Sequence, residues 1–347
     1  MLRFIKSLSP RLRKTQETNL ALLSSAIIIR KSLCLSELAR AYPGPKRHCH
    51  RLKRLWRFLE NVRLDWTVVR RSLTRLSYCV DTTPGLLLPI LVDGTFFEPY
   101  EVLSASILRG GRALPIAWHT YHRRLEGEEE LSRNLIEEAF LTECLAQLVS
   151  GIQGVIIADR GFGRARLLLF LQDRKTDFVI RLAGEVQITH RDFSGLLEQL
   201  PLAPGRSWWM EGVWYRQDQA VQINLLAYWG QGQKEPWYLA TSLQDPKLTH
   251  TLYRKRMKIE HGFRDWKHHL RLRIPASRLV RSSQRAAMLV NAIVLAYWFL
   301  CLVGLRALPK AFQRQVTSWG KASFFRMALE FVTFPGPMPC TIPKMLT

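Results

Sequence analysis

Acidic residues are scarce in this sequence. The 347 residues include 28 Asp and Glu against 51 Lys and Arg, so the formal net charge is +23. An imbalance of this size repels itself in a folded chain unless a polyanion compensates for it. The composition therefore indicates a polyanionic partner. Charge alone leaves two classes of partner open, which are nucleic acid and an anionic membrane surface.

Paired cysteine spacing and a secretory leader are also missing. The cysteines are scattered along the chain, at Cys34, Cys49, Cys79, Cys144, Cys301 and Cys340. This distribution does not fit the disulfide framework of a small secreted domain. His48-Cys49-His50 lacks the second pair of ligands that a zinc site needs. The first residues contain no apolar run followed by a small-residue cleavage site, so we expect a reducing, cytoplasmic compartment.

The apolar content argues against disorder. Hydrophobic residues make up 47% of the chain, with 16 Phe and 11 Trp, which is enough for one large core and smaller domains. The segment 286–305 is nearly all apolar and long enough to cross a bilayer. Asn291 lies near its middle, however, and no second such segment exists. We therefore interpret it as a buried core helix and expect no membrane partner.

Residues 1–80 are predicted to be helical. Thr18–Arg30 carries apolar residues at helical spacing, and a Pro-Gly-Pro turn separates it from the basic amphipathic stretch Lys46–Leu59. A helix, a turn and a basic helix form the outline of a DNA-reading element, although many solvated helices are also basic. The DNA contacts expected from this stretch are Arg47, Arg51 and Arg54.

Two aspartates end two apolar runs that read as buried strands. Asp93 follows Leu86–Val92, and Asp159 follows Gly154–Ala158. Functional groups of an open sheet gather just beyond the strand ends, and carboxylate oxygens are the ligands that Mg²⁺ prefers. Such aspartates also cap helices or pair with arginines. Three further acids near the first strand are alternatives, namely Asp81, Glu98 and Glu101.

The remaining elements predict a mixed sheet with helices packed on it. The expected strands are 101–108 and 113–120 around a Gly-Gly hairpin turn, 178–182 and 237–241; the expected helices are 128–149, 164–173 and 245–270. Residues 184–235 are rich in Trp, Gly and Gln and show strand-like alternation. We interpret them as a β-rich insertion.

Four polar residues share one side of the predicted helix 245–270. Tyr253, Arg256, Glu260 and Lys267 lie at offsets 0, 3, 7 and 14, which at about 100° per residue fall within an arc of roughly 60°. The other side of this helix is polar too, so solubility does not account for the stripe. A carboxylate flanked by Arg and Lys suits a site where metal ions and cationic side chains share a phosphate backbone.

The spacing Tyr253-x2-Arg256-x3-Glu260-x6-Lys267 matches the signature of bacterial insertion-sequence DDE transposases of the YREK branch. Asp93-Gly-Thr and Asp159-Arg-Gly-Phe-Gly also resemble blocks of that family, and the resemblance covers about residues 85–305. It implies an α/β fold with a ribonuclease-H-like mixed sheet flanked by helices. A β-rich insertion and a helical N-terminal DNA-binding region would complete the chain.

The resemblance also implies roles for individual residues. Asp93, Asp159 and Glu260 would be catalytic and would bind two Mg²⁺ ions about 3.5–4 Å apart, with Mn²⁺ able to substitute. Cleavage at the transposon ends would be followed by transfer of the 3′ hydroxyl into target DNA. Tyr253, Arg256 and Lys267 would hold DNA phosphates, and Trp237 would stack on a base flipped out of the duplex.

The expected organisation follows the same resemblance. It assigns residues 1–80 to the DNA-binding region, 81–183 to the first part of the catalytic core, 184–235 to the insertion, 236–305 to the second part of the core, and 306–347 to a C-terminal tail. The expected partner is double-stranded DNA, as transposon ends and target, bound by a homodimer in the bacterial cytoplasm at the nucleoid. The tail is too short for the large C-terminal dimerisation domain of some relatives.

Two other functions stay open at this point. One is a metal-dependent ribonuclease-H-like nuclease that cuts DNA and never joins it. The other is a non-catalytic basic protein that binds DNA or associates with a membrane.

Overall fold

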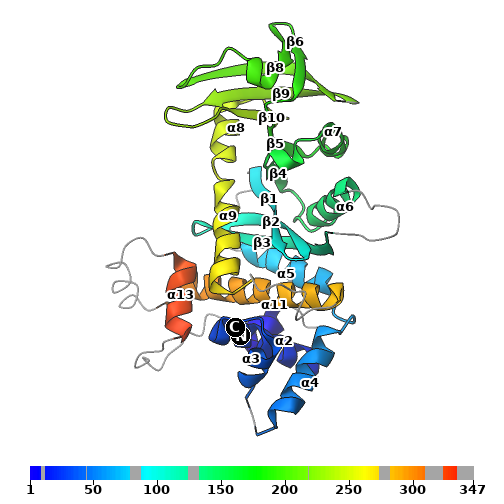
Figure 1. Ribbon diagram of the computed structural model, residues 1–347, viewed down its shortest axis with the longest axis vertical. Helices are drawn as coiled ribbons and strands as arrows, with labels where there is room; N and C mark the ends of the chain where they lie inside the picture. The colour runs from blue at the N-terminus through cyan, green and yellow to red at the C-terminus, as the bar shows by residue number, and fades with distance from the viewer. Residues whose placement is uncertain are drawn as a thin grey trace.

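Helices, a long central helix and a sheet succeed one another along the longest axis of the chain (Figure 1). The computed structural model describes residues 1–8, 12–43, 45–78, 87–123, 133–217, 219–272, 282–308 and 323–333. Several predictions fall outside this part of the chain: Asp81, the start of the first strand at Leu86, the start of the helix at Glu128, and most of the tail 306–347.

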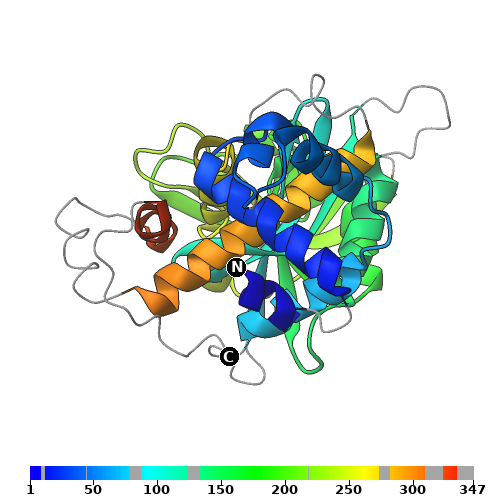
Figure 2. The ribbon, with the colours of Figure 1, turned by 90° about the horizontal axis from the view of Figure 1, so that it is seen from below.

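The chain begins with a group of helices, some of which pack directly against the central helix α11. They are α1 (Leu2–Leu8), α2 (Lys14–Arg30), α3 (Leu35–Arg40), α4 (His48–Leu59) and α5 (Trp66–Tyr78), and α11 spans Ser283–Leu302. The Ser24 hydroxyl on α2 donates to the Ala292 carbonyl of α11 at 3.1 Å. Seen from below, these helices cover α11 (Figure 2). Their bounds agree with the helices predicted near 18–30 and 46–59 to within a few residues.

The apolar composition of α11 is explained by burial. Ser283–Arg306 is the one described segment long and apolar enough to cross a membrane, but 89% of its most apolar window is buried inside the protein. The Trp118 indole donates to the Asn291 side chain at 2.5 Å, and the Trp298 indole donates to the Pro115 carbonyl at 2.7 Å. The prediction of a core helix is confirmed, because α11 packs against the sheet on one side and against α2 on the other.

Ten strands of the described residues form one mixed sheet in the order β3-β2-β1-β4-β5-β10-β9-β8-β6-β7. Their bounds are β1 Leu87–Phe97, β2 Tyr100–Arg109, β3 Arg112–His122, β4 Gln153–Ala158, β5 Asp177–Leu182, β6 Gln187–His190, β7 Phe193–Leu196, β8 Arg206–Gln217, β9 Gln219–Trp229 and β10 Trp237–Thr241. β4 pairs in parallel with β1 and with β5, and the other neighbours are antiparallel. The mixed α/β fold is confirmed.

The central strands are buried on both faces, which explains their continuous apolar runs. Leu91, Ile157 and Val179 point to the core that also contains α9 and α11. Ile90, Ile156 and Ile180 point to the core under α6 (Arg133–Leu145) and α7 (Ala165–Asp173). Alternate residues of one strand therefore serve two separate cores.

The residues between β5 and β10 extend the same sheet. Strands β6 to β9 continue it beyond β10 through the pairing of β9 with β10. A bulge between Met210 and Val213 bends β8, with Gly212 at φ 66°. The division of the chain into domains stays a prediction.

The helix predicted over 245–270 is three consecutive segments rather than one. They are α8 (Pro246–Tyr253), α9 (Met257–Arg264) and η3 (Asp265–His269), which is π-helical. Between α8 and α9 the Arg256 amide bonds to Tyr253 three residues back, at 2.9 Å, and in η3 the Leu270 amide bonds to Asp265 five residues back, at 3.1 Å. The uniform turn of about 100° per residue therefore does not extend to Lys267.

The remaining described helical segments are η1 (Arg160–Phe162), η2 (Leu197–Gln199), η4 (Val303–Ala307) and α13 (Phe324–Thr333). α13 packs against α11 and η4. Figure 1 shows α8 and α9 running as a nearly straight rod from the β10 side of the sheet to α11.

Candidate active site

The pairing of β1 with β4 places Asp93 beside Asp159. Leu91 pairs with Ile157, so each aspartate lies two residues beyond a paired residue of a parallel ladder. A spacing of two residues keeps each aspartate on the strand face of Leu91 and Ile157, which is the face covered by α9. The sequence predicted that Asp93 ends its strand, and this prediction is wrong. β1 continues to Phe97 because it also pairs with β2, where Asp93 lies opposite Ser104.

Asp159 lies at the sheet edge and also stabilises the turn that follows it. It precedes η1, and its side chain accepts a hydrogen bond from the Gly161 amide at 2.9 Å. This bond makes it the N-terminal cap of the turn. A glycine at 161 suits the approach, because a Cβ there would lie 3.1 Å from the Asp159 carboxylate.

Arg256 joins Asp93 to Glu260. One guanidinium nitrogen lies 3.3 Å from Asp93 Oδ2, and another donates to Glu260 Oε1 at 2.6 Å. The side chains of Arg256 and Asp93 are 13% and 15% exposed, whereas that of Glu260 is 38% exposed. The structure therefore brings together Asp93, Asp159, Glu260 and Arg256, and we call this group the acid cluster.

The acid cluster raises the pKa of Asp93 to about 7. Burial is the largest cause, and the negative charge of Asp159 adds to it. Glu260 raises the pKa further, while Arg256 and the Gly94 amide oppose the increase. Like charges that are forced together disfavour ionisation, so a cation placed among these carboxylates would stabilise their charged forms.

The donor chemistry of the acid cluster fits a divalent metal ion. Carboxylates are the preferred ligands of Mg²⁺, and the charges of Asp159 and Glu260 add to the burial that raises the pKa of Asp93. Within the described ranges, no three His, Cys, Asp or Glu side chains are close enough together to hold a metal ion. Glu260 instead gives an oxygen to Arg256. Metal binding would therefore require Glu260 to exchange Arg256 for the ion.

Trp237 and Tyr253 pack against each other next to the acid cluster. Their ring centroids are 5.0 Å apart in an edge-to-face arrangement, and Tyr228 and His250 complete an aromatic group. Tyr253 is buried, which raises the pKa of its hydroxyl, and this hydroxyl also interacts with Arg256. Trp237 is partly buried at the start of β10. Lys267 lies in η3 and is also partly buried.

A second layer of ion pairs supports the loop after Asp159. Glu137 on α6 is fully buried, accepts a hydrogen bond from Arg133 at 2.8 Å, and pairs with Arg164. Arg164 also donates to the Gly161 carbonyl in the loop capped by Asp159. Sequence reasoning missed Glu137, because a Glu in an amphipathic helix carries no sign that it will be buried.

The alternative acids near the first strand have separate surroundings. Glu101 is buried beside Gly94, and a Cβ at position 94 would lie 2.6 Å from the Glu101 carboxylate. The same carboxylate lies 3.7 Å from the guanidinium of Arg133. Glu98 is exposed and pairs with Arg123 at 3.0 Å.

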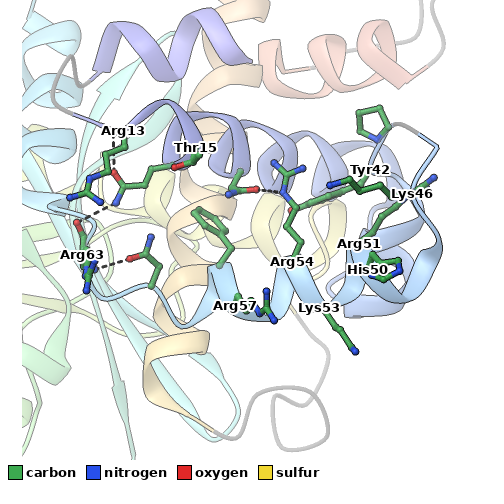
Figure 3. Close-up of a pocket in the computed structure, with 15 residues that line it drawn as sticks. Arg13, Thr15, Tyr42, Lys46, His50, Arg51, Lys53, Arg54, Arg57 and Arg63 are labelled. Atoms are coloured by element: carbon green, nitrogen blue, oxygen red, sulfur yellow. Dashed lines mark hydrogen bonds between the residues drawn. The ribbon is translucent and has the colours of Figure 1, made fainter.

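A separate groove of about 770 Å³ lies between α2 and α4 (Figure 3). We call it the basic groove, and the lysines and arginines that line it are Arg13, Lys46, Arg51, Lys53, Arg54, Arg57 and Arg63. The Arg54 side chain donates to Asn19 across the groove at 2.6 Å. Tyr42 also lines it, and its buried hydroxyl has no hydrogen-bond partner in the described part of the chain.

The structure places two of the three predicted N-terminal DNA contacts in this groove. Arg51 and Arg54 line it, whereas Arg47 lies beside it as the exposed residue before α4. In Figure 1, α2 and α4, whose residues line the basic groove, lie on the other side of α11 from α9, which carries Glu260.

Residues 136–298 match the family model of the transposase DDE domain. The matched range includes Asp159, Glu260 and α11 as far as Trp298, and it leaves out Asp93 and the N-terminal helices. No curated protein matches the chain.

The fold and the match together support an enzyme of the DDE transposase class, which acts on DNA. A mixed sheet with an aspartate two residues beyond the last paired residue of each of two adjacent parallel strands agrees with that class.

Proposed function

We propose that this chain is a transposase of the insertion-sequence YREK branch. It would cleave DNA at transposon ends and transfer the freed 3′ hydroxyl into target DNA. The observation that carries the proposal is the convergence of the acid cluster, in which two aspartates just beyond the paired residues of β1 and β4 meet a glutamate from a distant helix. The match to the transposase DDE domain over residues 136–298 supports the same reaction class.

Asp93, Asp159 and Glu260 would hold two Mg²⁺ ions, or Mn²⁺ in their place. When bound, such ions supply Lewis-acid stabilisation of the attacking and leaving oxygens of a phosphodiester. Before metal binds, Arg256 neutralises part of the charge on Asp93 and Glu260. If Glu260 held a metal ion in place of Arg256, the guanidinium of Arg256 would be able to bind a DNA phosphate in bidentate fashion.

The neighbouring residues would position the DNA strand. Lys267 and the hydroxyl of Tyr253 supply a point charge and a hydrogen-bond donor for phosphates. Trp237 offers an indole for stacking on a flipped base, an interaction that contributes about 1–3 kcal/mol.

Trp237→Ala should therefore slow strand opening more than it weakens DNA binding, with Trp229→Ala as the control. Equal loss in the two assays would contradict a stacking role.

The N-terminal helices would hold the DNA duplex through its backbone. Arg51 and Arg54 in the basic groove, with Arg47 at its side, match the charge of phosphates. The proposed division of labour assigns residues 1–80 to this contact, 81–183 and 236–305 to catalysis, 184–235 to an insertion, and 306–347 to a tail. A homodimer assembled on DNA in the bacterial cytoplasm, at the nucleoid, would bring two ends together.

Asp159→Asn tests the catalytic assignment. An asparagine keeps the oxygen that caps η1 but removes the negative charge, so the fold and DNA binding should persist. Strand cleavage with Mg²⁺ should fall by at least about 100-fold, because loss of metal-ion catalysis forfeits several kcal/mol of transition-state stabilisation. Cleavage and gel-shift assays on the same DNA would measure the two effects.

The matched control is Asp173→Asn, at the exposed end of α7. It changes the net charge equally and should leave cleavage unchanged. If the Asp159→Asn variant still cleaved DNA, the assignment of Asp159 as a catalytic residue would be wrong. A pre-cleaved DNA end with a free 3′ hydroxyl would then separate a transposase from a nuclease, since only the transposase joins that end to a second duplex.

A further inference from the structure

A second basic pocket, of about 330 Å³, lies near the C-terminal end of the helix that carries Glu260. Four segments build it: Arg112 at the start of β3, His261 and Arg264 on α9, Asp265 and His269 in η3, and Ser323 and Arg326 at α13. We call it the helix-end pocket. It shares a helix with the acid cluster and draws none of its lining from the basic groove.

The helix-end pocket holds more positive charge than its own residues neutralise. Asp265 is the only carboxylate among the described residues that line it, against three arginines. Asp265 is 5% exposed and lies 3.5 Å from the Arg112 Nε. These two atoms, Asp265 Oδ2 and Arg112 Nε, are both buried and have no hydrogen-bond partner within the described residues. Arg264 and Arg326 are exposed at the rim.

The surroundings of His269 agree with this excess of positive charge. Burial is the largest cause that lowers its pKa, and nearby cations lower it further. The groups responsible are Arg326, His268, Lys31 and Arg112, of which Arg326 and Arg112 line the pocket. His269 also packs against the Phe325 ring, at 5.9 Å between centroids.

The π-helical turn η3 sits at this pocket. Asp265 and His269 begin and end it, and both line the pocket. A π turn has poorer geometry than an α turn, and such turns in natural proteins are frequent at functional sites. Two separate features therefore coincide at one place: two buried polar atoms without a hydrogen bond among the described residues, and a π-helical turn.

The position of the helix-end pocket relates it to the acid cluster. Arg264 lies one turn after Glu260, roughly 6 Å along the axis and about 40° round the helix. That distance corresponds to about two nucleotide steps, since bases in a duplex are spaced about 3.4 Å apart along each strand. A strand whose phosphate is held at the acid cluster would pass the exposed guanidinium of Arg264.

We propose that the helix-end pocket binds a backbone phosphate of the DNA, close to the phosphate held at the acid cluster. This proposal rests on the proposed function, because it takes DNA as the substrate. Arg264 and Arg326 contact the phosphate, and Arg112 is oriented behind them by Asp265. Rim arginines that are open to solvent suit a strand that runs across the surface.

The double substitution Arg264→Ala with Arg326→Ala tests this assignment. Both side chains are exposed, so the fold should persist. Affinity for duplex DNA would be measured by fluorescence anisotropy over a series of salt concentrations with EDTA present. Loss of one phosphate contact reduces the slope of log affinity against log salt by about 0.9. We expect a reduction of that size and a several-fold weaker affinity at low salt.

Two matched variants complete the comparison. Arg166→Ala with Arg174→Ala removes the same charge from α7, on the opposite face of the sheet, and should leave the slope unchanged. Arg264→Lys with Arg326→Lys keeps the charge and should restore most of the slope. Inorganic phosphate, added at constant ionic strength, tests whether the pocket takes a free ion instead.

The outcomes separate the pocket from the proposed function. The proposal is supported if the slope of log affinity against log salt falls only in the Arg264→Ala, Arg326→Ala variant, and if inorganic phosphate does not compete with DNA. An unchanged slope in a wild-type chain that does bind DNA overturns the pocket and leaves the transposase assignment intact. Displacement of phosphate binding without any effect on DNA also overturns it, in favour of a free-anion site. A wild-type chain that fails to bind DNA overturns both proposals.

Discussion

Arg256 lies 163 residues along the chain from Asp93, whereas every residue that lines the basic groove falls between Arg13 and Arg63. The acid cluster is assembled by the sheet, from two parallel strands and a helix that returns to them. The groove is assembled by one local run of helices. The two regions should therefore respond differently to substitution: the acid cluster depends on buried charges, and the groove depends on a sum of exposed ones.

The largest expected effect is the loss of the buried charge at Glu137. Glu137→Gln would leave Arg133 and Arg164 without their anion, and breaking a buried ion pair typically costs about 3 kcal/mol or more. Arg133 and Arg164 are partly exposed, so we expect about 2–3 kcal/mol less stability in urea unfolding. The loop that contains Asp159 should also exchange its amide protons faster.

Glu138→Gln is the matched control for that substitution. It is the next residue on α6, and its bonds to Arg166 lie near the surface. Exposed pairs contribute at most about 1 kcal/mol. Equal losses for the two variants would show that the buried network does not support the loop.

The pH dependence of stability should reveal the crowding of the acid cluster. The folded pKa of Asp93 is raised to about 7 from an ordinary 3.8, so the native state holds a proton that the unfolded chain releases. The contribution of Asp93 to the free energy of unfolding is therefore complete below about pH 4 and is lost as the pH rises to about 7. Asp93→Asn should flatten that decline and make the metal-free protein more stable than the wild type at pH 8, by about 2 kcal/mol.

Thermal unfolding in EDTA at pH 4, 6 and 8 would measure this effect. Asp265, whose pKa is also raised by burial, to about 6, contributes in the same direction and persists in the Asp93 variant. The difference between the two proteins therefore isolates Asp93. A wild type with constant stability over this range would contradict the raised pKa of Asp93.

The smallest effect is expected in the basic groove. Arg54→Ala removes one exposed cation and its bond to Asn19, so stability should change by less than about 1 kcal/mol. DNA affinity should fall about uniformly across sequences, and the salt slope should fall by about 0.9 if Arg54 holds one phosphate. Thr18→Ala on the exposed part of α2 is the control. A sequence-dependent loss would indicate that Arg54 contacts bases instead of phosphates.

The contrast between local and distant contacts explains which features of the structure could be predicted from the sequence. The strand that ends at Asp159, the hairpin turn at Gly110 and Gly111, and the basic helix α4 each depend on a short stretch of sequence. Periodicity and turn residues report such local preferences well. The buried helix α11 was also predictable, because twenty residues without a charged face have few other places in a protein.

The register and the irregular turns were not predictable. Nothing in the run before Asp93 indicates that Leu91 pairs with Ile157, since any neighbouring residue offers similar apolar contacts. The π turn after Arg264 and the tight turn before Met257 interrupt a pattern that reads as one helix. The two turns flank α9, which packs against β3, a strand far away in the sequence.

The sequence by itself determined the basic character of the protein, its strand and helix segments, and the identity of the acids at the strand ends. These features follow from composition and from contacts between residues close along the chain. Only the tertiary structure decided that Arg256 bridges Asp93 and Glu260, that Glu137 is buried beneath the Asp159 loop, and that Asp265 shares a pocket with Arg326. Charges reach such places because many apolar contacts elsewhere offset the cost of their burial, and that balance belongs to the whole fold.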